Sequence, residues 1–238
     1  MYSRLIQYID QNNILDNSQY GLFRAGSSTS HAIVDIISTI QNNIDNKLFS
    51  CAVFIDLKKA FDTVDHAILL KKLYLYGIRG ITNDWFISYL YNRTQTTEVS
   101  GSISTKETNP YGVPQGSVLG PLLFLLYIND ITNSSNKLNF FLFADHTNLL
   151  YAHKSLKSLE IAVNSELLKL SDWLTANKLT LNIEKSNFVI FRPHRKKIDI
   201  ALNIKLIGND TDQLVNLERK ENVKYLGILI DSHLSWRN

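Results

Sequence analysis

The chain has 238 residues, 45% of them hydrophobic and 20% charged, which is the composition of a folded domain with a sizeable core and excludes extensive disorder. Its 25 lysines and arginines against 22 aspartates and glutamates give a net charge of +3, which neither requires nor excludes a nucleic-acid partner. The only cysteine, Cys51, cannot form an internal disulfide, and no apolar stretch is long enough for a signal peptide or a bilayer. We therefore expect an intracellular chain, nuclear or cytoplasmic and not secreted, without membrane contact.

The first predicted elements are a buried strand and a helix. Residues 50–55 (SCAVFI) form an apolar run that stops at Asp56, which predicts a strand with a carboxylate at its end. Residues 65–76 place apolar side chains at helical spacing, with Asp65 in the N-cap position and Gly77 just past the end. A helix of about three turns is therefore expected to follow the strand.

The middle of the chain predicts two further helices and a hairpin. Residues 83–92 suggest a helix that carries Trp85, which we expect in the core. The alternation of polar and apolar side chains over residues 95–104 predicts a hairpin. Residues 117–131 are almost continuously apolar, and Pro121 fits a helix only in its first turn. A buried helix should therefore begin near the start of this run.

The second half of the chain begins with a hairpin and a long helix. Residues 140–144 predict a strand, a turn follows over residues 145–148, and residues 149–152 form the returning strand. Residues 155–177 place leucines and a valine at spacings of three and four, which predicts an amphipathic helix that packs on the sheet. Short strands should follow within residues 198–206 and 223–230.

This order of elements is the split β-α-β pattern, so the predicted fold class is α+β, with an antiparallel sheet and helices packed on one face. A right-handed crossover makes the first two strands run the same way, and the returning hairpin strand inserts between them. The carboxyl ends of the first two strands then share one edge of the sheet. Asp56 and Asp145 should therefore converge, although they lie far apart in the sequence.

Two carboxylates at one sheet edge predict a metal site. Neighbouring carboxylates remain ionised together at little cost only if a cation lies between them. Mg²⁺ prefers oxygen ligands and commonly bridges a few carboxylates to phosphates, which points to phosphoryl transfer. The alternative for each aspartate is that it simply ends its strand by entering a turn. For the pair, Asp56 and Asp145, we favour the metal site.

Three segments of the chain form distinctive blocks: residues 54–62 (FIDLKKAFD), 112–121 (GVPQGSVLGP) and 143–148 (FADHTN). They resemble successive signature blocks of reverse transcriptases, most of all those of Jockey-like non-LTR retrotransposons of the LINE type. Supporting blocks lie at residues 19–29, 179–191 and 223–231. The resemblance follows the family's block order over nearly the whole chain. It implies an enzyme that extends a DNA primer on an RNA template with deoxynucleoside triphosphates.

The resemblance also implies a division of the chain into polymerase parts. Residues 1–50 would be partial fingers, and residues 51–191 a palm with embedded finger and loop elements. Residues 192–238 would complete the palm and supply a primer-side hairpin, with the thumb largely missing. The expected fold is thus a polymerase palm plus partial fingers, and the oligomeric state stays open.

The resemblance assigns roles to single residues of the expected active site. Asp56 and Asp145 match metal-binding aspartates, and Lys185 matches a lysine near the departing pyrophosphate; a solvated lysine is the alternative. Phe61 matches the steric gate that distinguishes deoxyribose from ribose, with a plain core position as the alternative. The other nucleotide-binding candidates are Gln115, Gly116 and Arg24. Arg24 follows Gly-Leu-Phe where the family usually has Gly-Phe, which leaves its placement open.

Two segments are candidates for contact with the nucleic-acid strands. The basic loop comprises Arg192, Arg195, Lys196 and Lys197, and its alternative interpretation is a solvated loop. Tyr225 and Leu226 match a hairpin that supports the primer end in the family, and their alternative is an ordinary strand.

The chain departs from the family at His146, where the family has a second aspartate next to the one matched by Asp145. Imidazole is a poor ligand for Mg²⁺ and supplies no negative charge. We therefore expect weaker metal binding and an impaired polymerase. If the missing carboxylate supplied a few kcal/mol of transition-state stabilisation, the rate would fall roughly a hundredfold or more. The alternative is a shift to Mn²⁺, which tolerates nitrogen ligands better.

Two further alternatives remain for the function of the chain. It would be a catalytically inactive reverse-transcriptase-like module that still binds nucleic acid, or a fragment of a decayed element without function. His31, His66, His153 and His233 show no pair at metal-ligand spacing and receive no chemical role.

Overall fold

The structure, a computed structural model, describes residues 1–21, 28–91, 93–193, 195–196, 198, 200–208 and 213–235. The chain forms two compact units that alternate along the sequence. The helical unit comprises residues 1–15, 59–129 and 177–179, and the sheet unit comprises residues 16–58, 130–176 and 180–238. Because each unit is assembled from separate stretches, their borders differ from the linear division into polymerase parts, whose functional names stay predictions.

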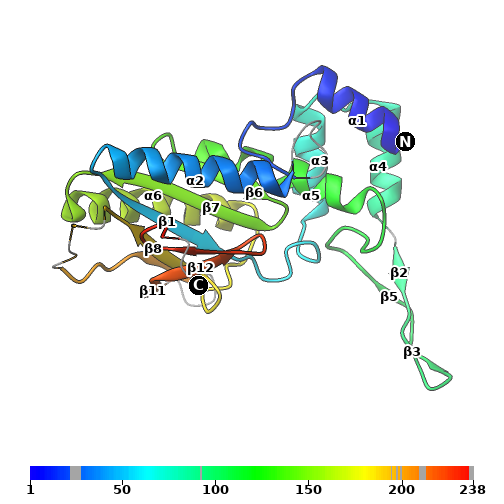
Figure 1. The fold of residues 1–238 in the computed structure, drawn as a ribbon. Coiled ribbons are helices and arrows are strands. Elements are labelled where there is room, and N and C mark those ends of the chain that lie inside the picture. Colours follow the sequence, from blue (N-terminus) through cyan, green and yellow to red (C-terminus); the bar gives the residue numbers. More distant parts are fainter. Residues whose placement is uncertain are drawn as a thin grey trace. The chain divides into compact units, whose positions relative to one another are not determined.

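The sheet unit is built on a five-stranded sheet in the order β11-β8-β1-β7-β6 (Figure 1). The strands are β1 (Phe49–Ile55), β6 (Asn139–Phe143), β7 (His146–His153), β8 (Asn187–Phe191) and β11 (Glu218–Lys220). β1 pairs antiparallel with β7 and β8, and β7 pairs antiparallel with β6. β1 and β6 therefore run in the same direction with the returning strand between them, which confirms the predicted split β-α-β order and the α+β class.

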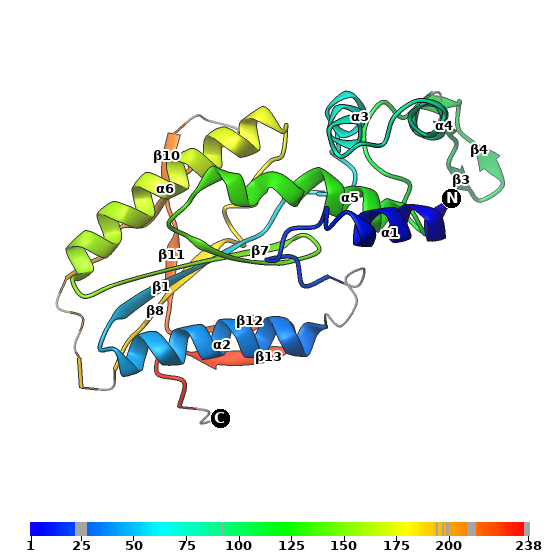
Figure 2. The ribbon, with the colours of Figure 1, turned by 90° about the horizontal axis from the view of Figure 1, so that it is seen from above.

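Helices cover both faces of this sheet. α2 (Thr29–Asp45) and α6 (Leu156–Ala176) lie on opposite sides of β1 and β8 (Figure 2). Ile36 and Ile40 of α2 pack in one core cluster with Ala52 of β1, while α6 contacts β1 and β7. The sequence predicts a helix layer on one face only. A second layer is present because every residue of β1 is buried, so both faces of this strand need an apolar cover.

Two short hairpins lie in the last part of the chain, one before and one after β11. β9 (Lys205–Gly208) pairs with β10 (Gln213–Asn216), and β12 (Asn222–Tyr225) pairs with β13 (Ile228–Asp231). The strand predicted within residues 198–206 therefore begins only at Lys205. The strand predicted within residues 223–230 is instead two strands joined by a tight turn at Leu226 and Gly227, whose φ angles are 45° and 93°.

The helical unit contains α1 (Tyr2–Gln11), α3 (His66–Leu75), α4 (Ile81–Leu90) and α5 (Gly120–Ile128). α3 confirms its prediction, because the Asp65 side chain caps it by accepting a hydrogen bond of 2.9 Å from the Ile68 N–H. α5 is buried as predicted but begins at Gly120. Ser117 ends the preceding loop, since its Oγ accepts from the Gly120 N–H at 2.9 Å and donates to the Pro114 carbonyl at 2.7 Å.

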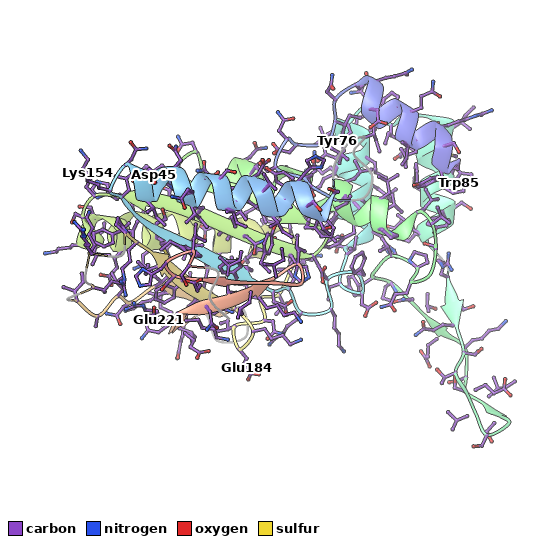
Figure 3. The ribbon with its side chains drawn as sticks, viewed as in Figure 1. Asp45, Tyr76, Trp85, Lys154, Glu184 and Glu221 are labelled. Atoms are coloured by element: carbon purple, nitrogen blue, oxygen red, sulfur yellow. The ribbon has the colours of Figure 1, made fainter. Side chains whose placement is uncertain are left out.

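The prediction that Trp85 lies in the core is wrong. Trp85 lies on α4 and is 37% exposed (Figure 3). Its ring stacks on Tyr89 and meets Phe86 edge-on, both at centroid distances of 5.2 Å. The neighbouring Phe86 is fully buried in its place. Adjacent helical residues point about 100° apart, so only one of two neighbouring aromatics can face the core directly.

The predicted hairpin is present as a longer, exposed arm of the helical unit. β2 (Thr94–Gln95) pairs with β5 (Glu107–Thr108), and β3 (Glu98–Val99) pairs with β4 (Ser102–Ile103). Of the helices that the structure describes, none has the length and apolar character needed to cross a membrane.

Candidate functional site

A cleft of about 340 Å³ opens at the carboxyl end of β1 in the sheet unit. Its walls come from β1, β7, β8, the turn before β8 and the β12–β13 hairpin. The polar side chains that line it are Asp56, His146, Asn148, Lys185, Asn187, Lys224 and Tyr225. Two of the three residues predicted to be catalytic, Asp56 and Lys185, therefore border one cavity.

The strand register places His146 opposite Asp56. Ile55 of β1 pairs with Thr147 of β7, and one step further along the two antiparallel strands brings Asp56 opposite His146. Side chains directly opposite each other point to the same face of a sheet, and their Cβ atoms lie roughly 5 Å apart. His146 and Asp56 therefore project from the same face of the sheet, and both line the cleft.

Asp145 lies at the same end of the sheet but in a different position. Because Phe143 pairs with His146, the turn between β6 and β7 contains only Ala144 and Asp145. The predicted turn over residues 145–148 is therefore too long, and His146 already belongs to β7. Asp145 is half-buried and does not line the cleft. The structure thus brings the Asp145 backbone to the predicted edge, one position away from the residue that faces Asp56.

The tight turn requires an unusual backbone conformation. Ala144 has a φ of 51°, which residues other than glycine, asparagine and aspartate rarely adopt. The left-handed conformation costs such a residue roughly 1–2 kcal/mol. Sheet pairing on both sides of the turn holds this conformation, and strained turns of this kind cluster at functional sites.

Asn182 is a residue of the site that the sequence reasoning missed. Its side-chain Nδ2 donates a hydrogen bond of 2.9 Å to Oδ2 of Asp56. Asn182 lies within the block at residues 179–191, in which the sequence predicts a role only for Lys185. No periodicity or spacing marks it, because its partner is 126 residues away in the sequence.

Lys185 projects from an exposed turn beside the cleft. Its backbone N–H donates to the Asn182 carbonyl at 3.2 Å, and its own carbonyl accepts from Nδ2 of Asn187 at 3.1 Å. The turn therefore has a defined conformation, while the Lys185 side chain is solvent-accessible. The predicted role beside a leaving group stays a prediction.

Tyr225 lies in the cleft wall with only 3% of its surface exposed, and its ring centroid is 6.1 Å from that of Phe54. Its buried hydroxyl has no hydrogen-bond partner of good geometry among the described residues. Burial, with a smaller effect of Tyr20, raises the pKa of this hydroxyl, and the Asn148 amide opposes the shift. Tyr225 therefore presents a neutral polar group. Leu226 is only partly buried and packs against the core cluster.

The predicted nucleotide-binding residues that are described lie in the helical unit. The Phe61 ring packs on Phe124 at 4.6 Å, and the Phe61 carbonyl accepts from the Val113 N–H at 2.8 Å. Gln115 donates through Nε2 to Oδ1 of Asp62 at 2.6 Å. The loop with Gln115 and Gly116 is thus tied directly to the segment with Phe61. Arg24 lies outside the described residues.

The basic loop lies at the other end of β1. Ser50 pairs with Phe191, so Arg192 lies opposite Phe49, about seven residues along β1 from Asp56, or roughly 23 Å. Arg192 donates to the Lys196 carbonyl at 3.2 Å, and Lys196 donates to the Lys47 carbonyl at 2.6 Å. These two side chains are therefore engaged within the protein. Arg195 is exposed, and Lys197 lies outside the described residues.

The donor set at the cleft fits a divalent ion that takes most of its ligands from water and substrate. Asp56 supplies hard carboxylate oxygens to the cleft, and Asp145 lies outside the cleft at the same sheet edge. Mg²⁺ is commonly held by one or two carboxylates together with phosphates. Within the described part of the chain, no cluster of three or more His, Cys, Asp or Glu side chains is arranged to hold a metal. The protein alone therefore offers an incomplete coordination shell.

Comparison with known proteins gives matches along nearly the whole chain. Residues 1–230 match the family described as "Reverse transcriptase (RNA-dependent DNA polymerase)". The probable RNA-directed DNA polymerase from transposon BS of Drosophila melanogaster is 30% identical over 98% of this chain and 26% of that protein. Its counterpart from transposon X-element of the same species is 28% identical over 98% of this chain and 25% of that protein. The chain thus spans about a quarter of the length of these relatives.

A solved structure shows the same fold at low sequence identity. The structure of apo telomerase from Candida Tropicalis superimposes with a TM-score of 0.61 at 13% identity, over 98% of this chain and 39% of that chain. The likeness supports the mixed α+β architecture and, at this identity, carries no information on activity.

Proposed function

The chain belongs to the reverse transcriptase family, and from this membership we propose that it is the polymerase domain of a Jockey-type non-LTR retrotransposon. In this proposal it descends from an RNA-directed DNA polymerase that adds deoxynucleotides to a DNA primer on an RNA template. The observation that carries the proposal is the cleft at the end of β1, which gathers Asp56, His146 and Lys185. Palm and finger assignments and an intracellular location belong to the same proposal.

Asp56 and Asp145 would hold divalent metal ions, Mg²⁺ or Mn²⁺. When bound, these ions would supply Lewis-acid chemistry for an in-line attack of the primer hydroxyl and stabilise the leaving oxygen. Lys185 would place its ammonium beside the departing pyrophosphate, where a positive charge balances developing negative charge. Its solvent-accessible position at the cleft suits contact with a ligand that enters from water.

The nucleotide would be recognised by residues of the helical unit. Phe61 would exclude the ribose 2′-hydroxyl by contact, since its ring is held in place by Phe124. Gln115 would offer its amide to the nucleotide, and Gly116, with a φ of 75°, would let the backbone approach closely. Arg195 and the residues around Tyr225 and Leu226 would contact the nucleic-acid backbone or the primer end.

His146 makes an impaired polymerase the expected state of this copy. The imidazole occupies the position opposite Asp56, so the cleft has one negative charge fewer than a pair of adjacent aspartates would give it. This observation also favours a second candidate function, a module that holds template and primer without extending it. A preference for Mn²⁺ over Mg²⁺ is the alternative for an active enzyme.

Primer extension on an RNA template tests the proposal and separates the two candidates. The natural chain, His146→Asp and Asp56→Asn are compared in Mg²⁺ and in Mn²⁺. Extension by His146→Asp that is roughly a hundredfold faster than by the natural chain, and absent in Asp56→Asn, supports an impaired polymerase. Equal extension by the natural chain and His146→Asp contradicts the impairment. Salt-dependent binding of duplex with no extension by any variant identifies a binding module.

A further inference from the structure

We infer that Asn182 is a positioning residue that holds the Asp56 carboxylate and the turn carrying Lys185 in one hydrogen-bonded assembly. The inference rests on the proposed role of the cleft. It concerns a residue that neither binds substrate nor coordinates metal, and that acts through the two residues it holds.

The main chain of Asn182 is fixed to the end of β1. Its N–H donates to the Asp56 carbonyl at 2.9 Å, and the Lys58 N–H donates to the Thr180 carbonyl at 2.8 Å. Leu57 and Leu181 form an antiparallel bridge between these two bonds. The two segments thus form a short ladder just beyond β1. This ladder fixes the position of the Asn182 main chain, from which its side chain extends.

From this fixed main chain the Asn182 side chain reaches one oxygen of the Asp56 carboxylate. The distance of 2.9 Å from Nδ2 to Oδ2 is that of a charge-assisted hydrogen bond. The other oxygen, Oδ1, accepts no hydrogen bond from the residues that the structure describes. Asn182 therefore selects one rotamer of Asp56 and leaves one oxygen for a ligand in the cleft.

The Asn182 carbonyl organises the turn that carries Lys185. It accepts hydrogen bonds from the N–H groups of Lys185 and Ser186, at 3.2 and 3.0 Å, and from the Ser186 hydroxyl at 2.8 Å. The Ser186 Oγ in turn accepts from the Asp56 N–H at 3.2 Å. The bonds form a closed circuit through Asp56, Asn182 and Ser186. A displacement of Asn182 would therefore move both the carboxylate and the lysine-bearing turn.

The chemistry of the amide suits this task better than a charged side chain would. A lysine at position 182 would neutralise Asp56 and compete with a metal ion, whereas an aspartate would repel the carboxylate. A neutral donor orients the carboxylate and leaves its charge intact. Residues that orient metal-binding side chains in this way typically contribute 10- to 100-fold to metal affinity.

The test measures Mn²⁺ binding to the full chain through the loss of the electron paramagnetic resonance signal of free Mn²⁺. Asn182→Ala removes the side-chain donor and keeps all main-chain bonds, and Asn182→Leu repeats the loss at nearly the original volume. Glu184→Gln is the matched control, because Glu184 is an exposed residue of the same turn (Figure 3). Asp56→Asn measures the background, which is the Mn²⁺ binding that does not require the Asp56 carboxylate. All variants are made in the natural chain and with His146→Asp.

We expect the Mn²⁺ dissociation constant to rise roughly 10- to 100-fold in both Asn182 variants and to stay within about twofold in Glu184→Gln. Equal Mn²⁺ dissociation constants for the parent and the Asn182 variants overturn the inference. The proposed function still stands in that case if Asp56→Asn loses the Mn²⁺ binding that the parent shows. If the parent and its His146→Asp form bind no more Mn²⁺ than Asp56→Asn, the proposed metal site is wrong and the inference falls with it. A melting curve of each variant identifies any that does not fold, and the other Asn182 variant then decides.

Discussion

Asp56 and His146 lie opposite each other at the ends of two neighbouring antiparallel strands, one step beyond the pair Ile55 and Thr147. Both side chains border the same cleft. Among the polar side chains of the cleft, this pair supplies one carboxylate and one nitrogen base, a combination that treats hard and soft cations differently. Metal preference is therefore the property through which this pair tests the proposed function.

We expect the natural chain to show a higher ratio of Mn²⁺-supported to Mg²⁺-supported primer extension than His146→Asp does. Nitrogen ligands bind Mn²⁺ better than Mg²⁺, while an added carboxylate serves both ions. A shift of the ratio by roughly tenfold corresponds to about 1.4 kcal/mol of differential binding. The measurement is initial rate against metal concentration for both proteins. Equal ratios would show that the imidazole does not contact the metal.

Gly112→Ala should destabilise the protein more than Gly101→Ala does. Both glycines have positive φ angles, 84° and 82°, so both substitutions incur the backbone strain of roughly 1–2 kcal/mol. At position 112 the new Cβ would also lie 2.8 Å from the Asp62 carbonyl oxygen, whereas nothing lies within 4 Å at position 101. Urea unfolding of the two variants measures the difference. The prediction fails if both lose the same free energy of unfolding.

Asp62→Ala should raise the KM for deoxynucleotides with little change in kcat. The Asp62 carboxylate accepts the Gln115 amide at 2.6 Å, so its removal frees an exposed side chain that is proposed to face the nucleotide. Both residues are exposed, and a few-fold effect is expected. Steady-state kinetics in a His146→Asp background provide the measurement, with Glu107→Ala as a control for charge. A fall in kcat at constant KM would contradict a role in nucleotide binding.

The stability of the helical unit should depend on pH through Asp65. Burial alone would raise the pKa of Asp65, but the hydrogen bond and charge of Lys178, with the N–H groups of Ile68 and Ala67, outweigh it and lower the pKa. The stabilisation is therefore complete above the unfolded-state pKa of about 3.9 and disappears as the pH falls through the lower folded-state value.

Asp65→Asn isolates this contribution, because asparagine also caps helices well. The natural chain should be the more stable of the two at neutral pH, and the gap should close below about pH 4. Urea unfolding at a series of pH values gives the comparison. A gap that stays constant down to pH 3 would show that the ion pair with Lys178 does not depress the pKa.

Phe86→Ala should cost about 3–5 kcal/mol of unfolding free energy, because it leaves a cavity in a closed core. Trp85→Ala should cost distinctly less, since Trp85 is partly exposed and loses mainly its contacts with the Phe86 and Tyr89 rings. The two neighbouring residues serve as controls for each other in thermal or urea unfolding. A larger loss for Trp85→Ala would reverse this assignment of the α4 core face.

Local periodicity in the sequence predicts single elements well, whereas contacts between distant segments are hard to predict from it. The apolar run before Asp56 and the leucine spacing of α6 lead directly to a strand and a helix, because burial pattern decides both. The length of the turn at Asp145 was not predictable, since Ala144 adopts a conformation that alanine disfavours. Asn182 escaped notice because its contact with Asp56 exists only after two distant segments have paired.

The pairing of the central strand also has a consequence for the synthesis of the chain on the ribosome. β1 pairs with β7 and with β8, and the ribosome makes both of these strands long after β1. Val53, for example, pairs with Leu149 and with Phe188. At roughly 5–20 residues per second, the nascent strand waits on the order of ten seconds or more before its second neighbour emerges. During that interval the apolar strand β1 lacks one of its partners, so it can aggregate or bind chaperones. The yield of folded protein should therefore respond to translation speed more than the stability of the finished molecule would suggest.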